Sequence, residues 1–140
     1  LFADGVQGGV DFVMTSQAIY TAIDPTYSAT VSRTLLSILR NDLKFKGIII
    51  TDDMANMPVG NPDLMEPYEA TVEALRAGQT MVMLGSRRSL IENVYTGLLN
   101  AYITDLSMKE IFDRNYIQIT EYKDQTLGRH PGMNIGGEEF

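Results

Sequence analysis

Three short apolar runs divide the chain at regular intervals. They cover residues 10–15, 48–51 and 81–84, and each is bounded by glycine or polar residues. The runs are too short for buried helices and consist largely of β-branched or large apolar residues, so they predict β-strands. Because both faces of each run are apolar, we expect parallel strands that are covered by helices.

Amphipathic helical patterns fill the intervals between these strands. The first has Ser32 as its expected N-cap, and the second begins at Pro67 and ends before Gly78. A third pattern begins near Ser89, and we expect a fourth helix to start at Ser107, whose hydroxyl would cap it. The predicted order is therefore strand, helix, strand, helix, strand, helix, helix.

This order predicts an α/β fold that is incomplete. The strand starts at residues 10, 48 and 81 are separated by about the length of a βα repeat. Three parallel strands leave two bare edges, whereas a (β/α)₈ barrel takes about 250 residues and a sheet usually has about four to six strands. We therefore expect further strands from the same gene product or from another chain. The aperiodic, glycine-rich segment 126–140 is expected to be an irregular tail.

Composition narrows the class of protein. The chain has 140 residues, enough for one ordinary domain, and 21% of them are charged, as in globular proteins. It has no cysteine, one histidine and a net charge of −7, so a cysteine-ligated zinc is excluded and binding to nucleic acid is disfavoured. No apolar run is long enough to span a membrane. The first residues include neither Met nor a basic region, so we expect a longer gene product, and the localisation is not predicted.

The strongest candidate for chemistry follows the second strand. Side chains alternate along a strand, so Asp52 should share a face with Ile48 and Ile50, opposite to Thr51. An acid at the carboxyl end of a buried parallel strand lies where βα folds place catalysis. From spacing alone, an equally good alternative is that Asp52 or Asp53 caps the following turn.

These residues resemble a known motif. Residues 38–42 and 47–55 are similar to the active-site motif of glycoside hydrolase family 3. Segments 13–20 and 23–27 resemble the stretch that precedes this motif in the β-N-acetylhexosaminidase branch, and 69–78 resembles the family's next helix. The resemblance covers about residues 2–125. The pair Asp52-Asp53, in place of Asp-Trp, is similar to the N-acetylglucosaminidase branch and not to the β-glucosidase branch.

The resemblance implies a (β/α)₈ barrel of which the three strands are the sixth, seventh and eighth. Residues 1–125 would form the C-terminal part of this barrel and 126–140 the tail. Asp52 would be the nucleophile of retaining glycoside hydrolysis, a mechanism that needs no metal or organic cofactor. Asp53, Met14 and Gln17 would bind substrate, although the family usually has His where this chain has Gln17.

The resemblance also implies groups that this sequence lacks. In this branch the acid/base is a histidine, paired with an aspartate, on a loop after an earlier strand, and the residues that hold the sugar are also earlier. His130 lies in a segment superficially similar to one of these, but the intervening aromatic is missing and we interpret it as a tail residue. We therefore expect no activity from this chain alone.

The expected function is that of a fragment of a retaining exo-β-N-acetylglucosaminidase. Its substrate would be a glycan or peptidoglycan fragment with a terminal β-linked N-acetylhexosamine, and its partner would be the N-terminal half of the barrel, in cis or as another chain. Two alternatives remain open. One is a non-catalytic α/β interaction module derived from such an enzyme, and the other is a phosphorylase or β-glucosidase variant of the same family.

Overall fold

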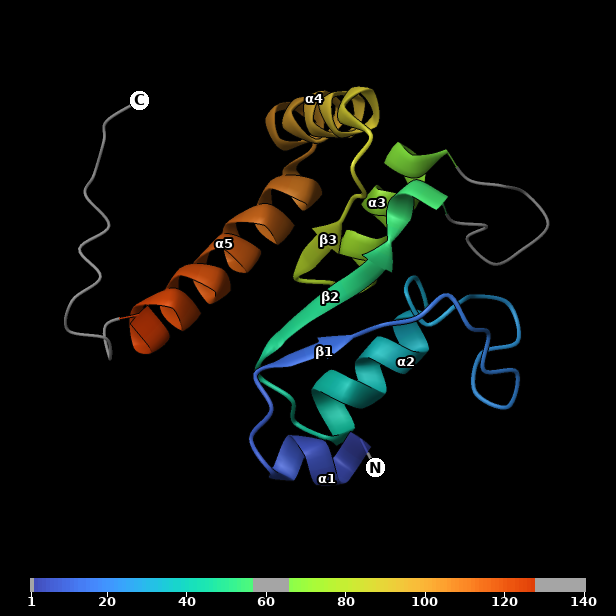
Figure 1. Cartoon of the computed structure of the whole chain (residues 1–140), viewed down its shortest axis with the longest axis vertical. Coiled ribbons are helices and arrows are strands. Elements are labelled where there is room, and N and C mark those ends of the chain that lie inside the picture. Colours follow the sequence, from blue (N-terminus) through green and yellow to red (C-terminus); the bar gives the residue numbers. More distant parts are fainter. Residues whose placement is uncertain (1, 57–65, 128–140) are drawn as a thin grey trace.

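A small parallel sheet forms the centre of the protein (Figure 1). The computed structural model describes residues 2–56 and 66–127. Its strands are β1 (Phe12–Met14), β2 (Ile48–Asp53) and β3 (Met81–Met83), in the order β1-β2-β3, with both pairs parallel. The prediction of three parallel strands separated by helices is thus confirmed.

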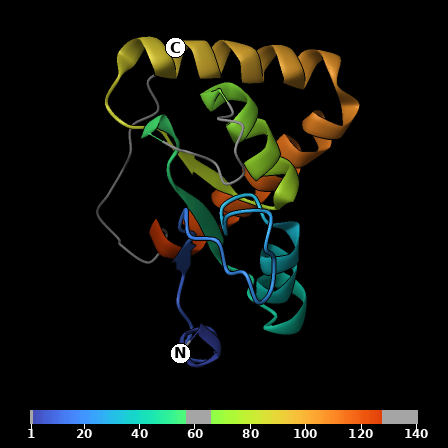
Figure 2. The ribbon, with the colours of Figure 1, turned by 90° about the vertical axis from the view of Figure 1, so that its right-hand side faces the viewer.

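A helix precedes the first strand, and helices follow each strand in the predicted order. They are α1 (Phe2–Gln7), α2 (Arg33–Ser37) with its π-helical continuation η1 (Ile38–Asp42), the 3₁₀ turn η2 (Met54–Asn56), α3 (Pro67–Ala77), α4 (Arg88–Thr104) and α5 (Leu106–Leu127). The sequence analysis did not predict α1, which is short and has no buried residue. Figure 2 shows α4 lying across one end of the molecule, beyond α3.

Local signals set several helix ends as expected. The Ser32 hydroxyl accepts a hydrogen bond from the Leu35 N–H at 3.1 Å, as an N-cap does. The same hydroxyl donates to the Asp24 carboxylate at 2.6 Å, which lowers the pKa of Asp24. Helix α3 has Pro67 in its first turn and ends at Gly78, whose φ of 122° suits a residue without a Cβ.

Two predicted boundaries are wrong. Helix α5 begins at Leu106 and not at Ser107, because the Asp105 carboxylate accepts hydrogen bonds from the N–H groups of Ser107 and Met108. The helix continues to Leu127, so residues 126 and 127 belong to it and not to a tail. Residues 128–140, which include His130, lie outside the described part of the chain.

The core forms on the helix-covered side of the sheet. Ile49 packs with Leu36, Leu39 and Phe45, which come from α2, η1 and the connection to β2. A second cluster joins α3 to η2 and to the loop before α2. A third cluster joins α3 to α4 and α5. Helix α3 thus reaches the carboxyl end of β2 through Met54, the first residue after that strand.

Helix α5 crosses the opposite, amino-terminal edge of the sheet. The Asn115 amide donates to the carbonyls of Gln79 and Thr80, just before β3. The Gln118 amide donates to the carbonyls of Lys46 and Gly47, just before β2. Among the described helices none is both long enough and apolar enough to cross a membrane.

Candidate active site

A β-bulge interrupts the carboxyl end of β2. Ile50 pairs with Met81 and Asp53 pairs with Met83, so β2 has one more residue than β3 over this interval. The extra residue lies within Thr51-Asp52. Thr51 is fully buried, and its Oγ1 accepts a hydrogen bond from the Met83 N–H at 2.9 Å. Bulges often occur next to active sites, where they redirect a side chain, and this one contains the candidate nucleophile.

The Asp53 carboxylate ties the end of β2 to the loop after β3. Its Oδ1 accepts hydrogen bonds from the N–H groups of Ala55 and Gly85, both at 2.8 Å. A Cβ at position 85 would lie 2.7 Å from Asp53 Oδ2, so this close approach requires glycine. The sequence analysis did not single out Gly85, because only the packing of the two strands brings it to Asp53. The bond to Ala55 matches the turn-capping alternative for this residue.

Asp52 is bonded differently from both of its neighbours. It is half-buried, and its Oδ1 accepts one hydrogen bond, from the Asp53 N–H at 2.7 Å. Within residues 2–56 and 66–127, no group donates a hydrogen bond to Asp52 Oδ2. Asp52 therefore keeps one carboxylate oxygen available at the carboxyl end of the strand, whereas the side chains of Thr51 and Asp53 are engaged in holding the backbone.

Met14 and Gln17, at and after the first strand, were predicted to bind substrate. Of the two, only Gln17 forms a hydrogen bond with the acidic pair Asp52-Asp53 among the described residues. Its Nε2 donates to the Asp53 carbonyl at 3.2 Å, which places Gln17 at the same edge of the sheet as Asp52. Met14 is opposite Ile50 in the register, and its side chain is 59% exposed. It lines a groove of about 330 Å³ together with Leu36 and Leu39, on the open side of β1.

The turn η2, which follows Asp53, is bonded to the start of α4 by an arginine. Arg87, the N-cap residue of α4, donates from its guanidinium to the Ala55 carbonyl in η2. The next residue, Arg88, forms an ion pair with Glu92 one turn further along α4.

In the described part of the chain, no three histidine or acidic side chains are grouped as metal ligands would be. The arrangement offers a carboxylate and hydrogen-bonding groups at the carboxyl end of β2.

The model of the glycosyl hydrolase family 3 N-terminal domain matches residues 1–116. The chain belongs to this family. The resemblance inferred from residues 38–55 and their surroundings is thereby confirmed, and the small parallel sheet matches the barrel domain of the family.

Several curated relatives of this chain are named β-hexosaminidases. The β-hexosaminidase of Nitrosomonas eutropha is 31% identical over 93 residues, covering 66% of this chain and 26% of that protein. That of Pseudomonas aeruginosa is 28% identical over 120 residues, covering 84% of this chain and 35% of that protein. The chain thus spans about a quarter to a third of the length of these relatives.

Solved structures of the same family superpose on this fold. The β-N-acetylhexosaminidase of Beutenbergia cavernae gives a TM-score of 0.78 at 29% identity, with 87% of this chain and 36% of that chain covered. The β-N-acetylglucosaminidase of Thermotoga maritima gives 0.66 at 27% identity, with 79% and 24% covered. These relatives are glycosidases, as the sequence analysis expected for this family.

Proposed function

We propose that this chain carries the catalytic nucleophile of a retaining exo-β-N-acetylglucosaminidase, and that Asp52 is the nucleophile. The proposal rests on the difference in hydrogen bonding between Asp52 and its two neighbours at the bulge. Thr51 and Asp53 hold the backbone through their side chains, whereas Asp52 has one carboxylate oxygen without a hydrogen-bond donor among the described residues. A nucleophile needs such an oxygen, held in place but not consumed by other bonds.

The bonds of the acidic pair suggest how the reaction would start. The Asp53 N–H orients the Asp52 carboxylate through Oδ1, which leaves Oδ2 to attack C1 of the sugar. The C1–Oδ2 bond forms as the glycosidic C–O bond breaks, and the leaving oxygen takes a proton from the acid/base. Water then gives a proton to the acid/base and attacks C1, and the C1–Oδ2 bond breaks to release the carboxylate, with retention of configuration. Asp53 acts as a positioning residue, and Gln17 borders the pocket.

The acid/base and most of the sugar contacts would come from the rest of the barrel. Within the described residues β1 and β3 each pair with one strand, and the apolar side chains of Phe12 and Met14 on β1 are exposed. We place these three strands as the sixth to eighth of a (β/α)₈ barrel, completed by preceding sequence or by another chain. The substrates we propose are glycans or peptidoglycan fragments that end in β-linked N-acetylglucosamine.

The test compares Asp52→Ala, Asp52→Asn and Asp53→Asn in the protein with the complete barrel. Hydrolysis of an aryl β-N-acetylglucosaminide should fall at least about a thousandfold in both Asp52 variants and much less in Asp53→Asn. Azide should restore turnover of Asp52→Ala and yield the α-glycosyl azide, because it attacks from the side that the nucleophile occupied. Near-normal hydrolysis by Asp52→Asn would refute the assignment.

The protein with the complete barrel also distinguishes the proposed hydrolase from a phosphorylase, a β-glucosidase and a non-catalytic module. Products formed in phosphate buffer separate hydrolysis from phosphorolysis, and an aryl β-glucoside tests the β-glucosidase variant. The exposed apolar edge of β1 also fits a non-catalytic module that docks onto another protein. That alternative predicts no turnover of any aryl glycoside by the complete protein, in which case both the enzyme and the role of Asp52 are wrong.

A further inference from the structure

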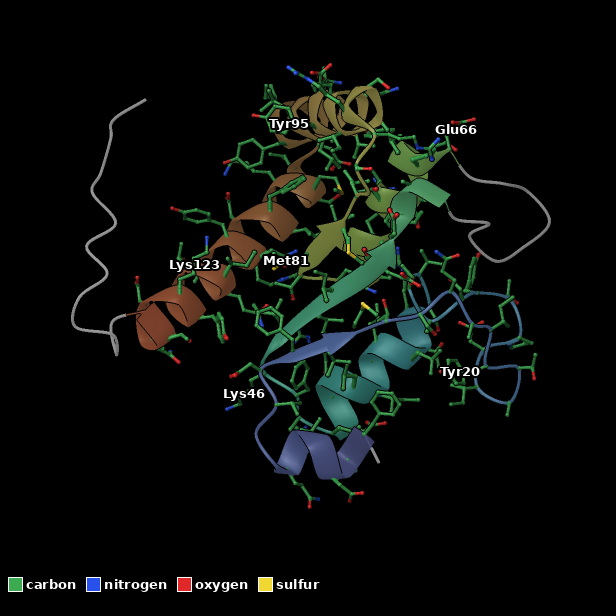
Figure 3. The ribbon with its side chains drawn as sticks, in the orientation of Figure 1. Tyr20, Lys46, Glu66, Met81, Tyr95 and Lys123 are labelled. Atoms are coloured by element: carbon green, nitrogen blue, oxygen red, sulfur yellow. The ribbon has the colours of Figure 1, made fainter. Side chains whose placement is uncertain are left out.

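A second groove lies at the amino-terminal edge of the sheet, away from Asp52. Its volume is about 640 Å³, and η1, α3 and α5 border it together with the residues before β2 and β3. Figure 3 shows Lys46 at the amino end of β2, at this edge. Asp52 lies at the carboxyl end of the same strand, so the two sites are at opposite ends of the sheet.

The charge of this groove is opposite to that of the chain. Its lining includes four cationic side chains and a single acid, Glu121. The cations are Arg40, Lys46, Arg76 and Arg114. The whole chain has only 11 Lys and Arg against 18 Asp and Glu, and a net charge of −7. A random share of the charged residues would make the groove acidic, so the clustering of cations needs a physical reason.

Arg40 is the innermost of these cations. Its guanidinium donates to the carbonyls of Phe45 and Gly47 at 3.1 and 2.6 Å, and to Thr80 Oγ1 at 2.8 Å. All of these acceptors are neutral, and within the described residues no carboxylate pairs with Arg40. Burial lowers the pKa of Arg40, and the nearby charge of Arg114 lowers it further. A partly buried cation next to another cation is stabilised by an anion between them.

The other cations differ in how far they are already neutralised. Arg76 forms ion pairs with Glu73 and Asp105, so its charge is compensated. Lys46 and Arg114 are exposed, and neither forms an ion pair in the part of the chain that the structure describes. Three cations therefore share the groove with one carboxylate, and α5 supplies both Arg114 and that carboxylate, two turns apart.

We propose that this groove binds a small multivalent oxyanion of the phosphate class, such as a phosphate ester or a diphosphate. Arg114 would bind the oxyanion through its planar guanidinium group, and Lys46 would add a point charge. The guanidinium of Arg40 already donates three hydrogen bonds, so Arg40 would contribute mainly its positive charge. The groove volume lies within the range of small-molecule sites. The site is separate from the proposed nucleophile, so it stands or falls independently of the proposed function.

Isothermal titration calorimetry of the protein with the complete barrel, with pyrophosphate at low ionic strength, tests the proposal. Arg114→Gln and Lys46→Gln should each weaken binding about tenfold, because each removes a charged donor from an exposed position. Glu121→Gln should tighten binding, since it removes the repelling carboxylate. Arg88→Gln is the matched control: Arg88 is paired with Glu92 on α4, outside the groove, and its loss should leave binding unchanged.

Several results would overturn the proposal. They are a lack of saturable pyrophosphate binding, an equal loss of affinity in Arg88→Gln, or citrate binding as tightly as pyrophosphate. Circular dichroism of each variant shows that lost binding does not reflect unfolding.

Discussion

Replacing Asp53 by Ala tests the claim that this carboxylate holds the candidate site together. The change leaves the N–H groups of Ala55 and Gly85 without their acceptor. A hydrogen bond to an ionised group contributes roughly 1.5–3 kcal/mol, and at this half-buried position water can replace part of it. We therefore expect the free energy of unfolding to fall by about 2–3 kcal/mol. The loop after β3 would also lose its attachment to β2.

Urea unfolding of the 140-residue chain, followed by circular dichroism, measures this loss. With a slope of roughly 2 kcal/mol per M of urea for a protein of this size, the midpoint should fall by about 1 M. Asp53→Asn keeps an acceptor oxygen and should recover most of the difference. Asp52→Ala is the matched control, since it removes one hydrogen bond to a neighbouring amide in place of two and should cost about half as much, roughly 1–1.5 kcal/mol.

Similar urea midpoints for Asp53→Ala and Asp52→Ala would refute this reasoning. If Asp53→Ala and Asp52→Ala unfold within about 0.3 M of each other, the two carboxylates do not have the different roles that their hydrogen bonds indicate. If Asp52→Ala is the more destabilised variant, Asp52 is the structural residue and the nucleophile assignment loses its support.

Further predictions concern the surroundings of the sheet. In Gly47→Ala the new Cβ would collide with the Asp11 carbonyl and lie 2.6 Å from Phe45 Cζ, so urea unfolding should show a loss of about 2–3 kcal/mol. The Ser107 hydroxyl and the Met108 N–H lower the pKa of Asp105, so its stabilising effect is present above the unfolded pKa and is lost as pH falls through the lower, folded value. Asp105→Asn should therefore flatten the decline of thermal stability below about pH 4, and an unchanged decline would contradict this.

Much of the local structure could be predicted from the sequence. The strands predicted at 48–51 and 81–84 lie at 48–53 and 81–83, and the N-cap at Ser32 and the end of α3 before Gly78 were also predicted from the spacing of apolar residues and from residue type. The resemblance around residues 38–55 was also sufficient to indicate the family. The cap of α5 was predicted two residues too late, because both Asp105 and Ser107 are good N-cap residues and spacing does not choose between them.

The sequence by itself determined the three strands, the four helices after them, their order and the acid at the end of the second strand, because hydrophobic periodicity and capping act over a few neighbouring residues. The tertiary structure decided the bulge at Thr51-Asp52, the bond from Gly85 to Asp53, and the meeting of Arg40 with Arg114. Each of these depends on how segments about 30 to 75 residues apart in the sequence come together. That arrangement is set by packing across the sheet, which no local pattern of residues specifies.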